Sequence, residues 1–350
     1  MKPQARLPGV AKREVFGWAM YDFANSGFTT VVITAVFSAY FVGAVAQGAP
    51  WGAFAWTATL GVSYALVMLT MPALGAWADL RAAKKRLLAV VTALCVLTTA
   101  ALALVGPGDL WLAIVLLILA NTTYSWGEST SYAFLPEIAT PEAIGKVSGW
   151  GWGLGYAGGM LTLGLCLAYV LSAQARGETA GDFVPVTMLI TAGMYGAASL
   201  FTFALLKERA EPQVAVAQAS GVRASLARLR STWQASRQYR DFSWLLTSAF
   251  FYQGGVAVAI TLAAIYAQQV IGFQADEVMI LVFVINAAAM AGALAFGYVQ
   301  DRIGHRLTLA VTLVGWAVTC VWAGLATDKA TFWGAAWLAG ICMGSSQSSG

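Results

Sequence analysis

Long apolar stretches alternate with short polar breaks along almost the whole chain. Ten stretches reach the length of about 20 residues that an α-helix needs to cross a bilayer core of about 30 Å. The predicted transmembrane helices lie at residues 17–46, 54–78, 87–106, 109–134, 147–172, 184–206, 243–270, 277–299, 307–326 and 331–350. The pattern therefore predicts an all-α, polytopic membrane protein.

One polar interval is much longer than the others and divides the chain in two. Its first part, residues 211–222, resembles a flexible linker. The following residues, 223–242, have the pattern of a basic amphipathic helix that would lie in the headgroup layer of a membrane. We expect a six-helix N-terminal bundle at 1–206, a cytosolic linker at 207–242 and a C-terminal bundle at 243–350.

Composition and charge agree with a membrane protein. The chain is 59% hydrophobic and 10% charged, which excludes an ordinary soluble domain. All of its 20 Lys and Arg residues except Arg176 and Lys329 fall on one side if the N-terminus is cytosolic. The net charge of +4 then reflects loops that face anionic lipid, and we expect no nucleic-acid partner. The stretch at 17–46 is too long for a signal peptide.

Residues that hold metals or perform covalent catalysis are scattered. The four cysteines lie singly inside apolar stretches, at Cys95, Cys166, Cys320 and Cys342. The single histidine, His305, lies in a polar loop. Residues 153–158 match the G-x-G-x-x-G pattern, but no strand precedes them, as a dinucleotide site requires. We expect no metal site, no cofactor and no enzymatic activity.

Two predicted helices carry acids on a polar face. In the first helix, Asp22 and Asn25 share a face with Thr29, and in the fourth, Asn121 and Ser125 share a face with Glu128. A carboxylate at membrane depth costs about 2.5 to 3.5 kcal/mol, so these faces should meet a cavity or a partner. We predict that Asp22 and Glu128 take part in proton coupling or gating. The alternatives are a solvated or capping Asp22 and a Glu128 that pairs with a loop arginine.

The fifth predicted helix carries a stripe of small residues. Gly151, Gly155 and Gly159 are spaced by four residues, a pattern that lets helix backbones approach closely in lipid. We predict a role in helix packing for them.

A charged loop pattern occurs twice. Gly75, Asp79 and Arg81 follow the second predicted helix, and Gly297, Asp301 and Arg302 follow the eighth. The repeated Gly-x3-Asp pattern with basic residues indicates two related halves.

The two loops resemble the signature of the major facilitator superfamily. The residues from Trp18 to Phe28, the glycine run from 149 to 159, and Gly344-x-x-Gln347 are similar to the bacterial "unknown major facilitator" family. That family is related to autophagy-linked vacuolar amino-acid effluxers. Ala82 departs from the pattern, because a glycine is usual there, and Gly304 keeps it. The superfamily has twelve helices, so we expect the last two to be missing from this chain.

The resemblance implies two six-helix bundles that rock around a central site, cytosolic loops that act as latches, and a monomer in the bacterial inner membrane. The cavity would be lined by Asn25, Thr29, Asn121, Ser125, Tyr252, Gln253 and Gln347. We expect a secondary transporter of a small organic solute, and the resemblance favours an amino acid as the solute, efflux as the direction and coupling to protons. The alternative is a membrane receptor or lipid-handling protein with the same fold.

Overall fold

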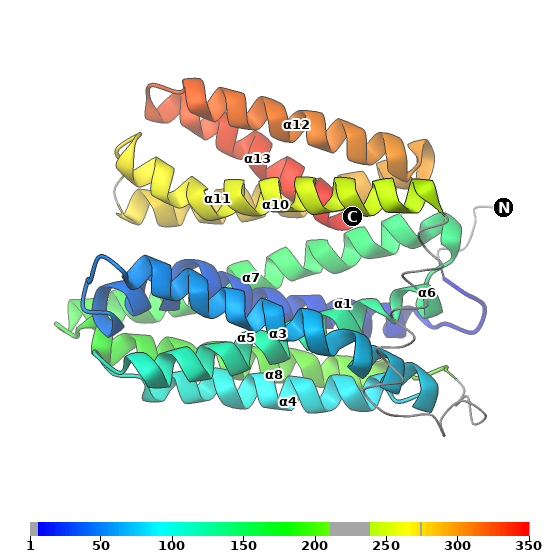
Figure 1. Ribbon diagram of the computed structural model, residues 1–350, viewed down its shortest axis with the longest axis horizontal. Coiled ribbons are helices and arrows are strands. Elements are labelled where there is room, and N and C mark those ends of the chain that lie inside the picture. The colour runs from blue at the N-terminus through cyan, green and yellow to red at the C-terminus, as the bar shows by residue number, and fades with distance from the viewer. Residues whose placement is uncertain (1–5, 211–238, 274, 350) are drawn as a thin grey trace. The chain divides into compact units, whose positions relative to one another are not determined.

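The computed structural model describes residues 6–210, 239–273 and 275–349, and nearly all of them are helical (Figure 1). The helical segments are α1 Lys12–Phe28, η1 Thr29–Ala35, α2 Phe37–Tyr40, η2 Phe41–Val45, α3 Gly52–Arg81, α4 Lys84–Ala101, η3 Leu102–Leu104, α5 Leu110–Tyr132, α6 Leu135–Ile138, η4 Pro141–Ala143, α7 Ile144–Ala175, α8 Ala180–Leu205, α10 Arg240–Gln269, α11 Ala275–Ile303, α12 His305–Leu325 and α13 Lys329–Ser349.

The long helices coincide with the predicted spans. Within the described residues, nine helical runs are long and apolar enough to cross a membrane, with Lys12–Val45 counted as one run. They lie at the first nine predicted positions, and α13 lies at the tenth. The prediction of an all-α, polytopic membrane protein is therefore confirmed.

The first span is less regular than a single helix. α1 passes at Thr29 into the π-helix η1, in which the N–H of Val36 bonds to the carbonyl of Val31 at 2.9 Å. A second π-helical segment, η2, follows α2. Wide turns of this kind are frequent at functional sites, and η1 begins one turn after Asn25. The sequence pattern gave no sign of this irregularity.

The described residues form two compact units. The N-terminal unit contains residues 6–140 and 154–210, and the C-terminal unit contains 141–153, 239–273 and 275–349. The first ten residues of α7 thus pack with the C-terminal helices, while the rest of α7 packs with the N-terminal ones. The predicted boundary at residue 206 stays a prediction, and most of the predicted amphipathic helix at 223–242 lies outside the described residues.

The N-terminal unit has an apolar core to which α1, η1, α2, η2, α4, η3, α5, α7 and α8 all contribute buried side chains. Phe28 is fully buried, and its ring stacks on Tyr124 of α5 at 5.0 Å between centroids. Leu117 and Met188 are also fully buried. This core fixes the face of α1 that turns toward α5, and so it fixes the direction of the polar side chains beside Phe28.

Glycines let α7 lie close against α1. A Cβ atom at Gly159 would lie 2.7 Å from the hydroxyl of Thr30. A Cβ atom at Gly155 would lie 2.9 Å from the hydroxyl of Ser26 and 3.3 Å from the carbonyl oxygen of Asp22. Any larger side chain at these positions would push the two helices apart.

The C-terminal unit has its own aromatic core. Tyr266 of α10 stacks on Phe332 of α13 with 6.0 Å between ring centroids, and Phe273 meets Phe332 edge to face at 5.7 Å. At one point the backbones of α11 and α13 are in direct contact, with no side chain between them. There a Cβ atom at Gly344 would overlap the carbonyl oxygen of Ala289.

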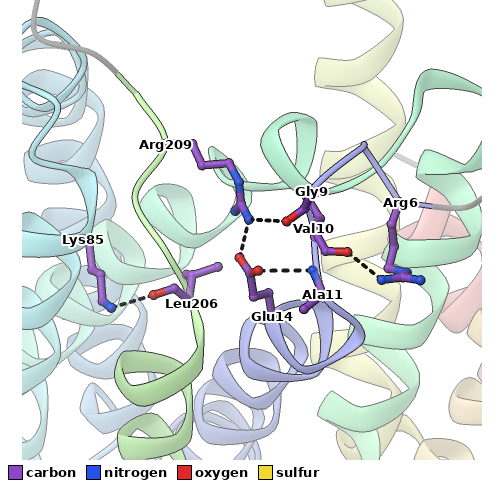
Figure 2. A network of polar contacts seen from close by, with 8 residues as sticks. All are labelled: Arg6, Gly9, Val10, Ala11, Glu14, Lys85, Leu206 and Arg209. Atoms are coloured by element: carbon purple, nitrogen blue, oxygen red, sulfur yellow. Dashed lines mark hydrogen bonds and ion pairs between the residues drawn. The ribbon is translucent and has the colours of Figure 1, made fainter.

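Polar contacts join the chain segments at the end of the N-terminal unit where α1 begins (Figure 2). Arg209, which follows α8, donates to the carboxylate of Glu14 in α1 at 2.6 Å, and Glu14 is only 1% exposed. Lys85 at the start of α4 donates to the carbonyl of Leu206 at 2.5 Å. These contacts hold the end of α8 against both α1 and α4.

The segment before α1 is also tied to its surroundings. The N–H of Leu7 bonds to the carbonyl of Ile138 at 3.3 Å, and Arg6 forms an antiparallel bridge with Ala139. Arg6 also donates to the carbonyl of Val10 at 2.5 Å. The start of the chain therefore fastens α1 to the segment that follows α6.

Candidate functional site

Asp22 of α1 lies inside the N-terminal unit. It is 4% exposed, and its Oδ2 atom has no hydrogen-bond partner among the described residues. The close approach of α7 at Gly155 encloses it, because a Cβ atom there would lie 3.4 Å from the Cβ of Asp22. A buried ionised carboxylate without donors is costly, so the site calls for a proton or a cation.

Asn25 lies one turn further along α1 and is 3% exposed. Tyr195 of α8 donates to its Oδ1 atom at 2.5 Å, while its Nδ2 atom has no partner among the described residues. The Tyr195 hydroxyl also lies 3.3 Å from the hydroxyl of Tyr21, which in turn lies 2.9 Å from that of Thr92 in α4. These hydroxyls connect α1, α4 and α8 inside an apolar bundle.

Sequence reasoning missed Tyr195, although a signal was present. Thr187, Thr191, Tyr195 and Ser199 follow one another at four-residue spacing in α8 and all are buried. Such a stripe on one helical face is the same pattern that singled out α1 and α5.

Glu128 of α5 has a different environment from Asp22. It is partly exposed, and its Oε1 atom accepts hydrogen bonds from Tyr124 at 2.9 Å and Tyr132 at 3.4 Å. These tyrosines lie one turn before and one turn after it on the same helix. Glu128 lies close to α1, because a Cβ atom at the adjacent Gly127 would overlap the hydroxyl of Tyr21, the neighbour of Asp22.

No described Lys, Arg or His forms an ion pair with either acid. Within this part of the chain, the structure therefore gives no support to the alternative in which Glu128 pairs with a loop arginine. The structure also gives no support to a capping role for Asp22, because a capping carboxylate would accept a hydrogen bond from a backbone N–H group, whereas the Oδ2 atom of Asp22 has no described partner.

The remaining predicted polar residues of the N-terminal unit are mostly bonded within it. Asn121 donates to Ser63 of α3 at 2.6 Å. The hydroxyl of Thr29 donates to carbonyl oxygens of its own helix, one of them that of Ser26 at 3.2 Å. Ser125 is buried at 7% exposure. Thr29 is thus occupied by its own helix, whereas Asn121 retains a carbonyl oxygen without a partner among the described residues.

The other predicted cavity residues belong to the C-terminal unit. Gln253 donates to the hydroxyl of Tyr252 at 3.4 Å, and Gln347 of α13 is partly exposed. A separate, mainly apolar pocket of about 240 Å³ lies between α10, α11, α12 and α13, with Trp316 and Thr319 in its wall. None of the predicted site residues lines that pocket. A cavity formed jointly by both sets of residues stays a prediction.

The first charged loop forms a small ion-pair network in the N-terminal unit. Lys84 lies 3.2 Å from Asp79 and 2.8 Å from Glu137, which belongs to α6. Arg81 lies instead over the ring of Trp77 at 5.3 Å. A Cβ atom at Gly75 would meet nothing within 4 Å, so packing does not require glycine there.

The second charged loop holds the start of α7 within the C-terminal unit. Asp301 lies against the start of α7, where a Cβ atom at Gly145 would be 2.9 Å from its Oδ1 atom. A Cβ atom at Gly297 would lie 2.8 Å from the carbonyl oxygen of Gly145, so this glycine is needed for the contact. Arg302 is exposed. A carboxylate at a helix N-terminus is favourable because of the helix dipole.

The described residues contain no group of three His, Cys, Asp or Glu side chains that could hold a metal ion. The four cysteines are free, and Cys320 alone of them is exposed.

Comparison with known proteins gives consistent results. Residues 52–349 match the family described as "Vacuole effluxer Atg22 like". The chain is 30% identical to the "Uncharacterized MFS-type transporter YxiO" of Bacillus subtilis (strain 168), with 94% of this chain and 77% of the relative covered.

Similar folds occur among solved transporters. The human organic anion transporter MFSD10 (TETRAN) superposes with a TM-score of 0.67 at 15% identity, covering 97% of this chain and 90% of that one. The proton:xylose symporter XylE of E. coli superposes with a TM-score of 0.65 at 12% identity, covering 96% and 80%. At these identities the likeness concerns the fold.

Proposed function

Because the chain belongs to the Atg22-like vacuole effluxer family of the major facilitator superfamily, we propose that it carries an amino acid and couples this transport to protons. The family establishes a multi-pass membrane protein, a secondary transporter of a small solute and not an enzyme. Three parts of the proposal go beyond what the family establishes: that the solute is an amino acid, that transport is coupled to protons, and that its direction is efflux.

One observation carries the proposal. Asp22, which is 4% exposed, and Glu128 both lie in the N-terminal helical unit, and no described cation is paired with either of them. Intramembrane acids without counter-ions mark proton relays or substrate pathways. A small solute with a positive amino group suits such a site, whereas a polyanion would require arginine or lysine.

The two charged loops are proposed as latches of alternating access. In major facilitator folds, two bundles rock around a central site. The Lys84 ion pairs with Asp79 and Glu137 would stabilise the N-terminal unit, and Asp301 would hold the start of α7 in one of the two states. We further propose a monomer in the bacterial inner membrane, with a cytosolic N-terminus.

The test is uptake by proteoliposomes that contain the purified protein. Vesicles are loaded with one pool of unlabelled amino acids at a time, and exchange with labelled amino acids is measured with and without a pH gradient. We expect saturable exchange of one amino acid and faster uptake with the gradient. A lack of exchange with every pool would refute the amino-acid proposal and favour the receptor or lipid-handling alternative. Net uptake that the pH gradient does not accelerate would refute proton coupling.

A further inference from the structure

The two acids of the N-terminal unit differ in their hydrogen-bond donors. Asp22 is almost fully buried, and its Oδ2 atom has no described donor. Glu128 is partly exposed, and one of its oxygens receives two phenol hydrogen bonds. The buried amide nitrogen of Asn25, which also has no described partner, lies one turn from Asp22 on the same helix.

The titratable groups around the acids contain no described cation. The titratable groups near Asp22 or Glu128 are Tyr64 of α3, Tyr124 and Tyr132 of α5 and Tyr156 of α7, with Tyr21 on α1 itself. Tyr195 of α8 lies beside them, 3.3 Å from the hydroxyl of Tyr21. All of them are neutral phenols in their usual form. The buried Asp22 therefore has no described cation to balance its charge, and it would be neutralised by a proton or a cation that the protein takes up.

Hydrogen bonds decide which form of an acid is favoured. Phenol donors stabilise a carboxylate, whereas burial without donors favours a neutral acid. Two acids whose environments differ in this way commonly divide the acid and ionic roles between them. Their mutual repulsion strengthens the division, because ionising both at once is unfavourable.

We propose that Glu128 binds the cationic amino group of the solute and that Asp22 carries the coupled proton. This rests on the proposed function and assigns the roles within it. Asp22 takes a proton from water when the site opens to the more acidic side and returns it to water when the site opens to the other side, and only an O–H bond is formed and broken. Tyr124 and Tyr132 are positioning residues, since they hold the Oε1 atom of the Glu128 carboxylate.

The experiment compares two modes of transport in proteoliposomes. Exchange of labelled for unlabelled solute needs solute binding but no net proton movement, whereas gradient-driven uptake needs both. The probes are an α-amino acid that the protein exchanges, the amine that lacks its carboxylate, and the acid that lacks its amino group. The variants are Asp22→Asn, Glu128→Gln and, as an exposed control carboxylate, Glu142→Gln.

We expect Asp22→Asn to keep exchange and to lose the acceleration by the pH gradient. We expect Glu128→Gln to raise the KM for both amino-bearing probes about ten-fold or more in either mode, because a hydrogen bond to a charged group is lost. The probe without an amino group should compete poorly in every variant. Glu142→Gln should behave like the unmodified protein.

Positioning by the tyrosines is tested with Tyr124→Phe. Without its hydroxyl, Glu128 keeps only the longer bond to Tyr132, so protons should compete better with the solute. The KM of the amino acid should then rise at a higher pH than in the unmodified protein, with little change in kcat. Tyr40→Phe is the matched control, because its buried hydroxyl bonds to the Val105 carbonyl at 3.0 Å, away from the acids.

Several results would overturn the division of roles. One is that Asp22→Asn loses exchange while Glu128→Gln keeps it, and another is that both variants lose both modes equally while remaining folded. An unchanged pH profile in Tyr124→Phe also contradicts the role of Glu128. If the unmodified protein exchanges no amino acid or amine, then the proposed function itself fails. If either acid variant misfolds, the profile of Tyr124→Phe decides the outcome.

Discussion

Arg209 supports a buried carboxylate at the start of the first span, and its removal should lower stability measurably. The side chain of Glu14 is 2% exposed and that of Arg209 is 29% exposed, with 2.6 Å between the charged atoms. Breaking a buried ion pair by removing one partner costs about 3 to 5 kcal/mol, while an exposed pair contributes about 0 to 1 kcal/mol. This half-buried pair lies between the two cases.

We expect Arg209→Met to lower the free energy of unfolding by about 2 kcal/mol. The N–H of Ala11 still donates to Glu14 at 3.1 Å in this variant, which limits the loss. An unfolding entropy of about 2.1 cal/mol/K per residue is about 0.7 kcal/mol/K for this chain of 350 residues, so the melting temperature should fall by about 3 °C. The melting temperature is measured in detergent by heating the protein and monitoring the labelling of its buried cysteines with a thiol-reactive dye.

The control is a second ion pair of the same length on an exposed surface. Arg176 lies 2.7 Å from Glu178, and their side chains are 50% and 30% exposed. Arg176→Met should leave the melting temperature almost unchanged. A double-mutant cycle with Glu14→Gln then isolates the coupling, because the loss on Arg209→Met should largely disappear when Glu14 is neutral. Equal melting temperatures for Arg209→Met and Arg176→Met would refute the reasoning.

Three further predictions concern packing, backbone strain and the second loop. Gly159→Val should lower the free energy of unfolding by about 1 to 3 kcal/mol, because the new side chain would overpack against Thr30. Gly164→Val on the same helix should not lower it, since a Cβ atom there would meet nothing within 4 Å. Equal melting temperatures for the two variants would contradict the close approach at Gly159. Ala82 has a φ of 49°, in the left-handed region, where a residue with a Cβ atom is about 1 to 2 kcal/mol less stable than in a right-handed conformation. Because glycine lacks this strain, Ala82→Gly should raise the melting temperature slightly. Asp301→Asn removes a negative charge that stabilises the start of α7 by about 0.3 to 1 kcal/mol. The ratio of the inward-open to the outward-open state, measured by distances between spin labels, should therefore change by about two- to five-fold. An unchanged ratio would contradict the proposed role of Asp301 as a latch.

The sequence predicted the spans well, because a bilayer demands long apolar helices whatever their packing. It could not predict the π-helical turns after Thr29, since hydrophobic periodicity is blind to one extra residue in a turn. It also missed the burial of Glu14, because that depends on Arg209, which lies far along the chain. The polar faces of α1 and α5 were visible, but which side chains would find donors was not.

The packing glycines and the candidate proton site turn out to be parts of one arrangement. Sequence reasoning treated the stripe with Gly155 as a means of packing and Asp22 as separate chemistry. In the structure, α7 approaches α1 at Gly155 so closely that a Cβ would touch both Ser26 and Asp22. The absence of a side chain on α7 is therefore one reason that water is excluded from Asp22. A longer residue at Gly155 should hydrate this carboxyl as well as loosen the bundle, so proton coupling should suffer before the fold is lost.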